Sequence, residues 1–225
     1  MADTRKAAFF DVDGTLVRTN IVHAFGFYAM NQGTLFGTAW QTAKTVASLP
    51  LLWAADQANR KAFNEIFYRF YEGQSEDRLF TLADELFEKV LRPAIFPGTA
   101  KLLAQARRFG CRLVFCTGAL DFTVRRLADH LGADDLIANR MHFVDGFATG
   151  RVVPPIVEGA HKALAIRDYC TRQGLALDQS FAYSDSFSDY PMLSVVGHPA
   201  AVNPDLRLKS VARAYEWPVI STQEA

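Results

Sequence analysis

The chain has 225 residues, enough for one large domain or for a domain that carries an inserted segment. It contains 24 Lys and Arg residues and 24 Asp and Glu residues, so its formal net charge is +0. This balance does not favour nucleic acid or an anionic membrane surface as a partner. The three cysteines, Cys111, Cys116 and Cys170, form no CxxC motif, which indicates reduced core thiols in a cytoplasmic protein rather than a disulfide framework.

Two carboxylates follow the first apolar run. The stretch "KAAFFDVD" predicts a buried strand over residues 6–13 that ends in Asp11 and Asp13. Because side chains alternate along a strand, the two aspartates start on the same side. Mutual repulsion and desolvation penalise both charges, so the pattern indicates either a cation bound between them or a polar turn.

Residues 18–91 interrupt the alternation of strand and helix patterns that the rest of the chain shows. Within them, residues 34–55 carry Lys44 as their only charge and have the length of a membrane span. The central lysine and Pro50 favour a buried or interfacial helix instead. Aromatic residues at helical spacing over residues 63–70 predict core packing. We expect residues 18–91 to form a mostly helical cap over the functional site.

Strand and helix patterns alternate after residue 91. Helices are predicted over residues 98–110, 121–132, 159–174 and 189–197, and strands over residues 111–118, 180–186, 198–203 and 217–221. Thr99 is the expected N-cap of the first of these helices, and Phe109 is expected in its buried stripe. Asp145-Gly146 between two apolar stretches predicts a β-hairpin.

This order of elements predicts an α/β fold. The expected architecture is a doubly wound parallel sheet with helices on both faces, a three-layer αβα arrangement, together with the inserted helical cap. The expected core domain comprises residues 1–17 and 92–225, and the cap comprises residues 18–91. In such sheets the functional site lies outside the carboxyl ends of the strands.

Polar groups suited to phosphoryl transfer stand at the predicted strand ends or helix starts. They are Asp11, Asp13, Thr117, Gly118, Lys162, Asp185 and Asp189. Carboxylates such as Asp11 and Asp185 suit a hard cation such as Mg²⁺. One carboxylate can attack phosphorus while a second moves protons to and from the oxygens. Lys162, Thr117 and the backbone N–H groups around Gly118 can hold the phosphate oxygens.

Each group also has a simpler interpretation when it is taken alone. Asp-x-Asp-Gly is often a turn, and a lysine near a helix start is usually solvated. Thr-Gly is common, and "SDSFSD" can be a cluster that caps a helix. The combination in this order, with each member at a strand end, favours one shared site.

The motifs resemble those of the haloacid dehalogenase-like hydrolase superfamily, in its phosphoserine-phosphatase-like branch (subfamily IB type). The resembling stretches are "FFDVDGTL", "FCTGA", the lysine of "GAHKAL", "YSDSFSDYPML" and "GHPAAVNPD". The resemblance implies a Rossmann-like core with Asp11 as nucleophile. It implies that Asp13 is the general acid/base and a metal ligand through its backbone carbonyl. Asp185 would be a further ligand of Mg²⁺, and Asp189 would support the metal site.

Two features of the first motif and the residues after it narrow the range of expected substrates. The acid at Asp13 favours phosphate-ester hydrolysis, since dehalogenases of the superfamily lack that acid and its transport ATPases carry Thr there. Phosphoserine phosphatases place a Glu soon after the first motif, whereas "VRTNIVHAF" contains no acidic residue. Phosphoserine is therefore not the expected substrate. Arg18 and His23 are the candidate substrate-binding residues at the entrance to the cap.

The leading hypothesis is a Mg²⁺-dependent phosphatase that hydrolyses a small organic phosphomonoester through an aspartyl-phosphate intermediate. A lipid-phosphate phosphatase with a membrane-touching cap and a phosphotransferase are the alternatives, and membrane contact is not favoured. A catalytically silent binding protein of the same fold is the hypothesis from another class. The sequence does not determine the oligomeric state.

Overall fold

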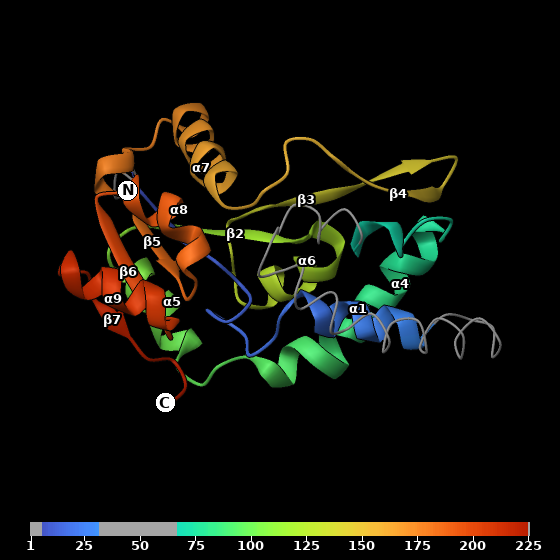
Figure 1. The fold of residues 1–225 in the computed structure, drawn as a ribbon, viewed down its shortest axis with the longest axis horizontal. Helices are drawn as coiled ribbons and strands as arrows, with labels where there is room; N and C mark the ends of the chain where they lie inside the picture. The colour runs from blue at the N-terminus through green and yellow to red at the C-terminus, as the bar shows by residue number, and fades with distance from the viewer. Residues whose placement is uncertain (1–5, 32–66, 225) are drawn as a thin grey trace.

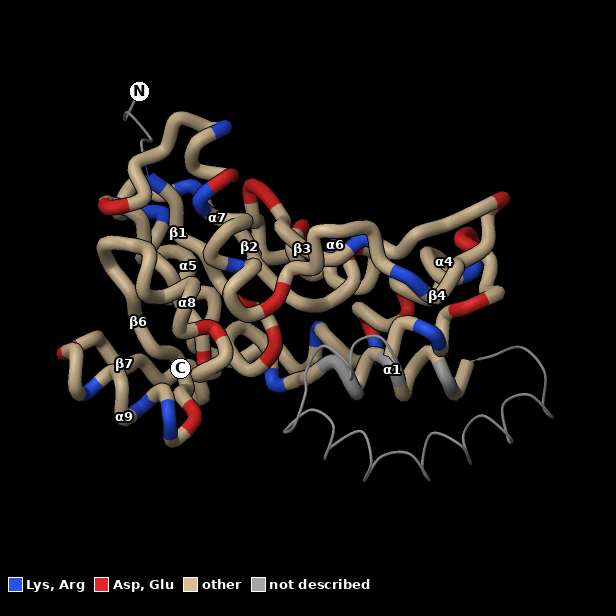
Figure 2. Tube along the Cα trace, turned by 45° about the horizontal axis from the view of Figure 1, so that its top comes forward, with Lys and Arg blue, Asp and Glu red and all other residues tan. Residues whose placement is uncertain are grey.

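The computed structural model describes residues 6–31 and 67–224 (Figure 1, Figure 2). The predicted membrane-length segment 34–55 and the first part of the aromatic stripe lie outside these residues. The described chain forms a seven-stranded sheet in the order β4-β3-β2-β1-β5-β6-β7. The strands are β1 (Ala7–Phe10), β2 (Arg112–Leu120), β3 (Asp135–Val144), β4 (Phe147–Val153), β5 (Phe181–Ser184), β6 (His198–Val202) and β7 (Val219–Ile220).

All neighbouring strands are parallel except β4, which is antiparallel to β3. The helices are α1 (Ile21–Met30), α4 (Glu76–Leu86), α5 (Thr99–Arg108), α6 (Asp121–His130), α7 (Ala160–Gln173), α8 (Tyr190–Ser194) and α9 (Leu206–Ala214). Short 3₁₀ or π segments cover Phe87–Leu91, Arg92–Ala94, Leu177–Gln179 and Phe187–Asp189. The predicted α/β fold with a mostly parallel sheet is therefore confirmed.

Alternate residues of β1 pack into two different clusters, one on each face of the sheet. Phe10 joins the cluster that contains the buried faces of α5 and α6. Phe9 joins the cluster that contains buried residues of α7, α8 and α9. Burying both faces explains why the parallel strands are nearly continuous apolar runs. The predicted three-layer arrangement is confirmed.

The predicted hairpin is confirmed between β3 and β4. Asp145 and Gly146 form its turn with φ angles of 50° and 77°, as a two-residue hairpin turn requires. Residues 73–76 pair with the turn and with the start of β4: Gly73 N donates to Ala148 O at 2.8 Å, and Glu76 N donates to Gly146 O at 2.8 Å. The hairpin therefore ties residues 73–76 to the edge of the sheet.

The two chain segments that bound residues 18–94 lie side by side. Val17 and Ile95 form an antiparallel bridge. Arg18 N donates to Ala94 O at 2.7 Å, and Phe96 N donates to Leu16 O at 3.0 Å. The chain therefore leaves the sheet after β1 and returns to it at one place.

Several details of α5 differ from the sequence predictions. Gly98, not Thr99, precedes the helix, because the Thr99 hydroxyl is buried and donates to Leu16 O at 2.7 Å. Phe109 is 44% exposed rather than buried, because the helix ends before it and its ring stacks on Phe181. The sequence analysis also did not predict α9, whose N-cap is Asp205. Within the described residues, we find no helix with the length and apolar character needed to span a membrane.

Candidate active site

The carboxyl ends of β1 and β5 and the first turn of α7 meet at one place. Asp11 follows β1 directly, Asp185 follows β5, and Lys162 lies near the start of α7. Parallel neighbouring strands bring such residues to the same edge of the sheet. The structure therefore brings Asp11, Lys162, Asp185 and Asp189 together, although up to 178 positions separate them in the sequence.

A buried ion-pair network holds the first carboxylate. Lys162 Nζ lies 2.6 Å from Asp11 Oδ1 and 2.7 Å from Asp189 Oδ2, and all three side chains are nine-tenths or more buried. Burial alone would lower the pKa of the lysine, but the charges of Asp11 and Asp189 outweigh it and raise that pKa. Lys162 is therefore a fixed cation that orients one oxygen of Asp11. Asp189 Oδ2 accepts hydrogen bonds from Lys162 Nζ and from Ser184 Oγ.

Thr15 lies between the carboxylates of Asp11 and Asp185. Its Oγ1 is 3.5 Å from Asp11 Oδ2 and 3.2 Å from Asp185 Oδ1, and it accepts a hydrogen bond from Asp185 N at 3.0 Å. Burial raises the pKa of both carboxyl groups, and the Asp11 charge raises that of Asp185 further. Two desolvated carboxylates that face one hydroxyl are a donor set that an oxygen-seeking divalent cation would stabilise. Among the described residues, no three His, Cys, Asp or Glu side chains form a complete metal cluster, so a cation would also need backbone or water oxygens.

Gly14 allows this close approach. Its φ is +81°, and a Cβ atom added there would lie 2.1 Å from Asp185 Oδ2. Any side chain at this position would therefore meet both backbone strain and the Asp185 carboxylate. Asn203, which is itself at φ 48°, donates to Gly14 O at 3.3 Å and holds the turn from the other side.

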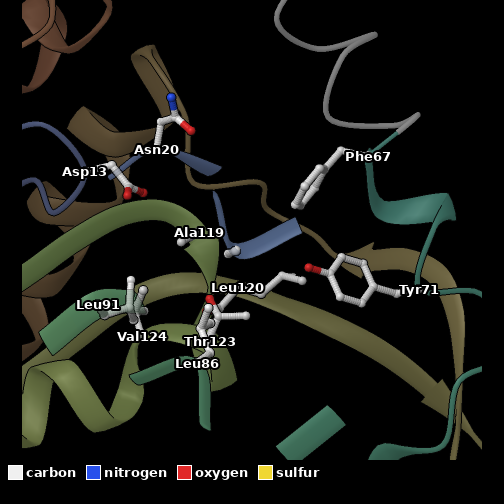
Figure 3. Close-up of a pocket in the computed structure, with 11 residues that line it drawn as sticks. Asp13, Asn20, Phe67, Tyr71, Leu86, Leu91, Ala119, Leu120, Thr123 and Val124 are labelled. Atoms are coloured by element: carbon white, nitrogen blue, oxygen red, sulfur yellow. The ribbon is translucent and has the colours of Figure 1, made fainter. Parts of the chain in front are cut away.

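Asp13 stands at the edge of a pocket next to the carboxylate cluster (Figure 3). Thr19 Oγ1 donates to Asp13 Oδ1 at 2.7 Å, which orients the carboxyl group. The pocket contains about 350 Å³ of empty space, part of it open to solvent. Its lining residues are Asp13, Asn20, Ala24, Phe67, Tyr71, Leu86, Leu91, Ala119, Leu120, Thr123 and Val124.

The predicted phosphate-binding pair lies within β2. Thr117 is 1% exposed, and its Oγ1 accepts from Ala119 N at 3.1 Å, which leaves its own proton available to another acceptor. Gly118 O accepts from Asn139 Nδ2 at 2.8 Å and from Tyr68 OH at 3.4 Å. The oxygen of Asn139 accepts from Val157 N at 2.7 Å. Asn139 therefore fixes the Gly118 peptide beside Thr117.

Sequence reasoning missed several of these supporting residues. The sequence analysis singled out neither Thr15 nor Asn139, although an Asn after the apolar residues Leu136–Ala138 indicates a polar side chain that needs hydrogen-bond partners if it is buried. Ser184 donates to Asp189 Oδ2 at 2.8 Å, a function that its position before Asp185 did not reveal. Cys116 is fully buried and its pKa is raised to about 12 by burial, in agreement with the expected packing role.

The two candidate substrate residues, Arg18 and His23, lie where the chain continues after β1 into residues 18–91. The guanidinium group of Arg18 lies over the Phe96 ring, 5.5 Å from its centroid. His23 is exposed near the start of α1, where its Nδ1 lies 3.1 Å from Asn20 N and 2.8 Å from Asn20 Oδ1. The substrate-binding role expected for these two residues stays a prediction.

The sequence is similar to known phosphatases. The phosphoserine phosphatase SerB1 of Mycobacterium tuberculosis is 34% identical over 218 residues, which cover 96% of this chain and 71% of the relative. A probable phosphatase of the same organism is 32% identical over 217 residues, which cover 96% of this chain and 75% of the relative.

Solved structures share the fold. A protein with unknown function from Bordetella pertussis Tohama I matches with a TM-score of 0.85 at 25% identity, over 96% of this chain and 98% of its own. A phospho-aspartyl intermediate analogue of phosphoserine phosphatase matches with a TM-score of 0.68 at 17% identity, over 99% of this chain and 95% of its own.

The family assignment rests on the sequence match together with this fold. A family model described as haloacid dehalogenase-like hydrolase matches residues 8–194, which include most of β1, all of α7 and the loop that carries Asp185. The relatives above 30% identity cover the same region. The chain therefore belongs to the haloacid dehalogenase-like hydrolase family.

Proposed function

We propose that this hydrolase is a Mg²⁺-dependent phosphatase that cleaves a small organic phosphomonoester through an aspartyl-phosphate at Asp11. The observation that supports this most is the environment of Asp11. One oxygen is bound to the buried Lys162 at 2.6 Å, and the other lies 3.5 Å from the Thr15 hydroxyl, which also contacts Asp185. A carboxylate with one oxygen anchored has a defined direction of attack for its other oxygen.

The reaction would proceed in two displacements. In the first, an oxygen of Asp11 forms a bond to phosphorus while the ester P–O bond breaks, and Asp13 donates a proton to the leaving oxygen. In the second, Asp13 takes a proton from a water molecule as that water attacks phosphorus, and the bond between phosphorus and Asp11 breaks. Both carboxyl groups then return to their starting protonation states. The bond from Thr19 to Asp13 supports this role, since it fixes the acid beside the pocket.

The phosphate oxygens would be bound by the Thr117 hydroxyl, by backbone N–H groups near Gly118 and by Lys162. The Asp11 and Asp185 carboxylates and the Asp13 carbonyl would hold Mg²⁺, which when bound supplies positive charge against the phosphate. Asp189 would keep Lys162 in place through their 2.7 Å ion pair. The cluster thus combines a positioned nucleophile, a proton carrier and cationic support.

We propose that the chain is divided into a catalytic core domain and a cap, as the order of the motifs suggests. Residues 1–17 and 92–225 would form the catalytic core domain, and residues 18–91 would form a cap that selects the leaving group. The pocket beside Asp13 supports this division, since residues from both segments line it. The relatives named phosphoserine phosphatase suggest that substrate, but the chain has no acidic residue between Asp13 and Asp56 to meet its amine. A phosphomonoester without that amine is the better proposal.

Hydrolysis of para-nitrophenyl phosphate with and without Mg²⁺ tests the proposal. We expect Mg²⁺-supported release of nitrophenol and phosphate in equal amounts, since a transfer to another acceptor would release less phosphate. Asp11→Asn should reduce the rate at least about a thousandfold, because it removes the nucleophile.

The matched control for this test is Asp168→Asn, which changes an exposed carboxylate on α7 and should leave the rate unchanged. An Asp11→Asn protein that remains folded and active would show that another group attacks phosphorus.

A further inference from the structure

The pocket beside Asp13 has an apolar lining and one end that carries polar groups (Figure 3). Its apolar lining residues are Ala24, Phe67, Leu86, Leu91, Ala119, Leu120 and Val124, to which the ring of Tyr71 adds. Asp13 is the one charged residue among the described residues that line it. A pocket of this kind removes water from a bound ligand, so it favours a mainly apolar ligand with few polar atoms.

The Tyr71 hydroxyl is the feature of this pocket that most directly indicates a bound ligand. The residue is 1% exposed, and its OH has no hydrogen-bond partner among the described residues. Buried tyrosine hydroxyls normally have a partner. Two neighbours show this, since Tyr28 OH donates to Leu79 O at 3.0 Å and Tyr68 OH donates to Gly118 O at 3.4 Å.

The direction of this hydroxyl is set by the packing of its ring. The Tyr71 ring meets Tyr28, Phe67 and Phe122 edge-on, with centroids 5.5, 5.7 and 6.1 Å away. Figure 3 shows the OH pointing across the pocket, toward the side on which Asp13 and Asn20 lie. Tyr71 OH is therefore a rigid hydrogen-bond donor across the pocket from Asp13, the acid that would protonate the leaving oxygen.

We propose that this site takes phosphomonoesters whose leaving group is a compact, uncharged, mainly apolar alcohol with one hydrogen-bond acceptor at its far end, which Tyr71 OH recognises. The inference rests on the proposed function, because it places the reacting oxygen at Asp13. A leaving group with a carboxylate would lose its hydration without meeting a cationic side chain among the described lining residues. Tyr71 is a specificity-determining residue in this proposal.

A matched pair of esters tests the proposal. The para-methoxyphenyl and para-ethylphenyl phosphates have similar sizes and leaving groups of similar acidity, and they differ by one ether oxygen in place of a methylene. We expect kcat/KM of the wild-type protein to be about fivefold higher for the methoxy ester than for the ethyl ester, because the methoxy oxygen adds one neutral hydrogen bond. The para-carboxyphenyl ester should be at least about tenfold poorer than either. Tyr71→Phe should remove the preference between the paired esters.

Tyr28→Phe is the matched control, because it deletes the hydroxyl of a contacting tyrosine that does not line the pocket. Tyr28→Phe should lower Tm, since it breaks the bond to Leu79 O, and should keep the ester preference. Tyr71→Phe should leave Tm unchanged or raise it, since its hydroxyl has no partner among the described residues. A lower Tm with an unchanged ester preference would show that Tyr71 has a structural role only, and would overturn the proposal.

Binding to Asp11→Asn protein separates this inference from the proposed function. Calorimetry with the same three esters measures binding in the pocket without turnover, so it remains informative even if no ester is hydrolysed. Preferential binding of the methoxy ester, lost on adding Tyr71→Phe, supports the inference. Equal binding, absent binding or tighter binding of the carboxyphenyl ester overturns it, whatever the hydrolysis assay shows.

Discussion

Thr15 and Asp185 are joined by two hydrogen bonds across 170 positions of sequence: Asp185 N donates to Thr15 Oγ1 at 3.0 Å, and Thr15 Oγ1 donates to Asp185 Oδ1 at 3.2 Å. The same hydroxyl is 3.5 Å from Asp11 Oδ2. Thr15 thus aligns the two carboxylates from which we expect the metal site to be built.

Thr15→Val should weaken Mg²⁺ binding by roughly tenfold while the maximal rate at saturating Mg²⁺ falls less. The change keeps the shape of the side chain and removes the hydroxyl that orients both carboxylates, and such orienting contacts contribute to metal affinity. The Mg²⁺ concentration for half-maximal hydrolysis measures the effect. Thr99→Val removes an equally buried hydroxyl that bonds to Leu16 O, and it should lower stability with no change in Mg²⁺ dependence.

Gly14→Ala should abolish Mg²⁺-supported hydrolysis and destabilise the protein by more than about 2 kcal/mol. The cost has two parts, backbone strain at φ +81° and the contact of the added Cβ with Asp185. Gly146→Ala isolates the first part, because its φ is +77° and an added Cβ would meet no atom within 4 Å. We expect this control to lose about 1–2 kcal/mol and to keep full activity. Equal losses of activity in both variants would contradict the argument from the Asp185 contact.

Lys162→Met should lower the free energy of unfolding by about 3–5 kcal/mol, since it leaves the buried Asp11 and Asp189 carboxylates without their cation. Urea unfolding at neutral pH measures the change. Arg172→Met breaks the exposed pair with Asp168 on the same helix and should cost less than about 0.5 kcal/mol. Similar losses in the two variants would show that the buried network contributes little to stability.

Asn139→Ala should weaken inhibition by inorganic phosphate and raise KM, each by roughly tenfold. The side chain fixes Gly118 O and Val157 N, and the peptide that contains Gly118 O also carries the N–H that bonds to Thr117. Losing these contacts would release the predicted phosphate-binding hydroxyl.

Met141→Ala is the control for Asn139→Ala. Met141 is a buried residue of the same strand, and we expect its truncation to cost about 2–5 kcal/mol. Phosphate inhibition should nevertheless stay unchanged. If both variants weaken phosphate binding alike, the effect of Asn139 is general destabilisation and not positioning.

The sequence predicted the parts of the site that follow from strand order. Asp11, Lys162 and Asp185 each stand at a strand end or helix start, and the topology of a parallel sheet brings such positions together. The Asp145-Gly146 hairpin was equally predictable, because two adjacent residues with positive φ form a local signal.

The hydrogen bonds that position the site residues were not predictable from the sequence, because they join residues that only the folded chain brings together. Thr15 meets Asp185 across 170 positions, and Asn139 meets Tyr68 across 71. Local spacing does not reveal such pairs. The buried, unpartnered state of Tyr71 OH depends in the same way on the rings packed around it.

The two ends of the segment 18–94 are hydrogen-bonded to each other, so another segment could take its place. Arg18 N and Ala94 O already lie within 2.7 Å, so evolution could replace the intervening residues with a longer or shorter insertion and leave the sheet register untouched. The replacement would still have to cover the apolar face of α6, where Phe122 packs against Tyr28 and Tyr71. Substrate choice can therefore diverge between descendants of this fold while Asp11 and Lys162 keep their geometry.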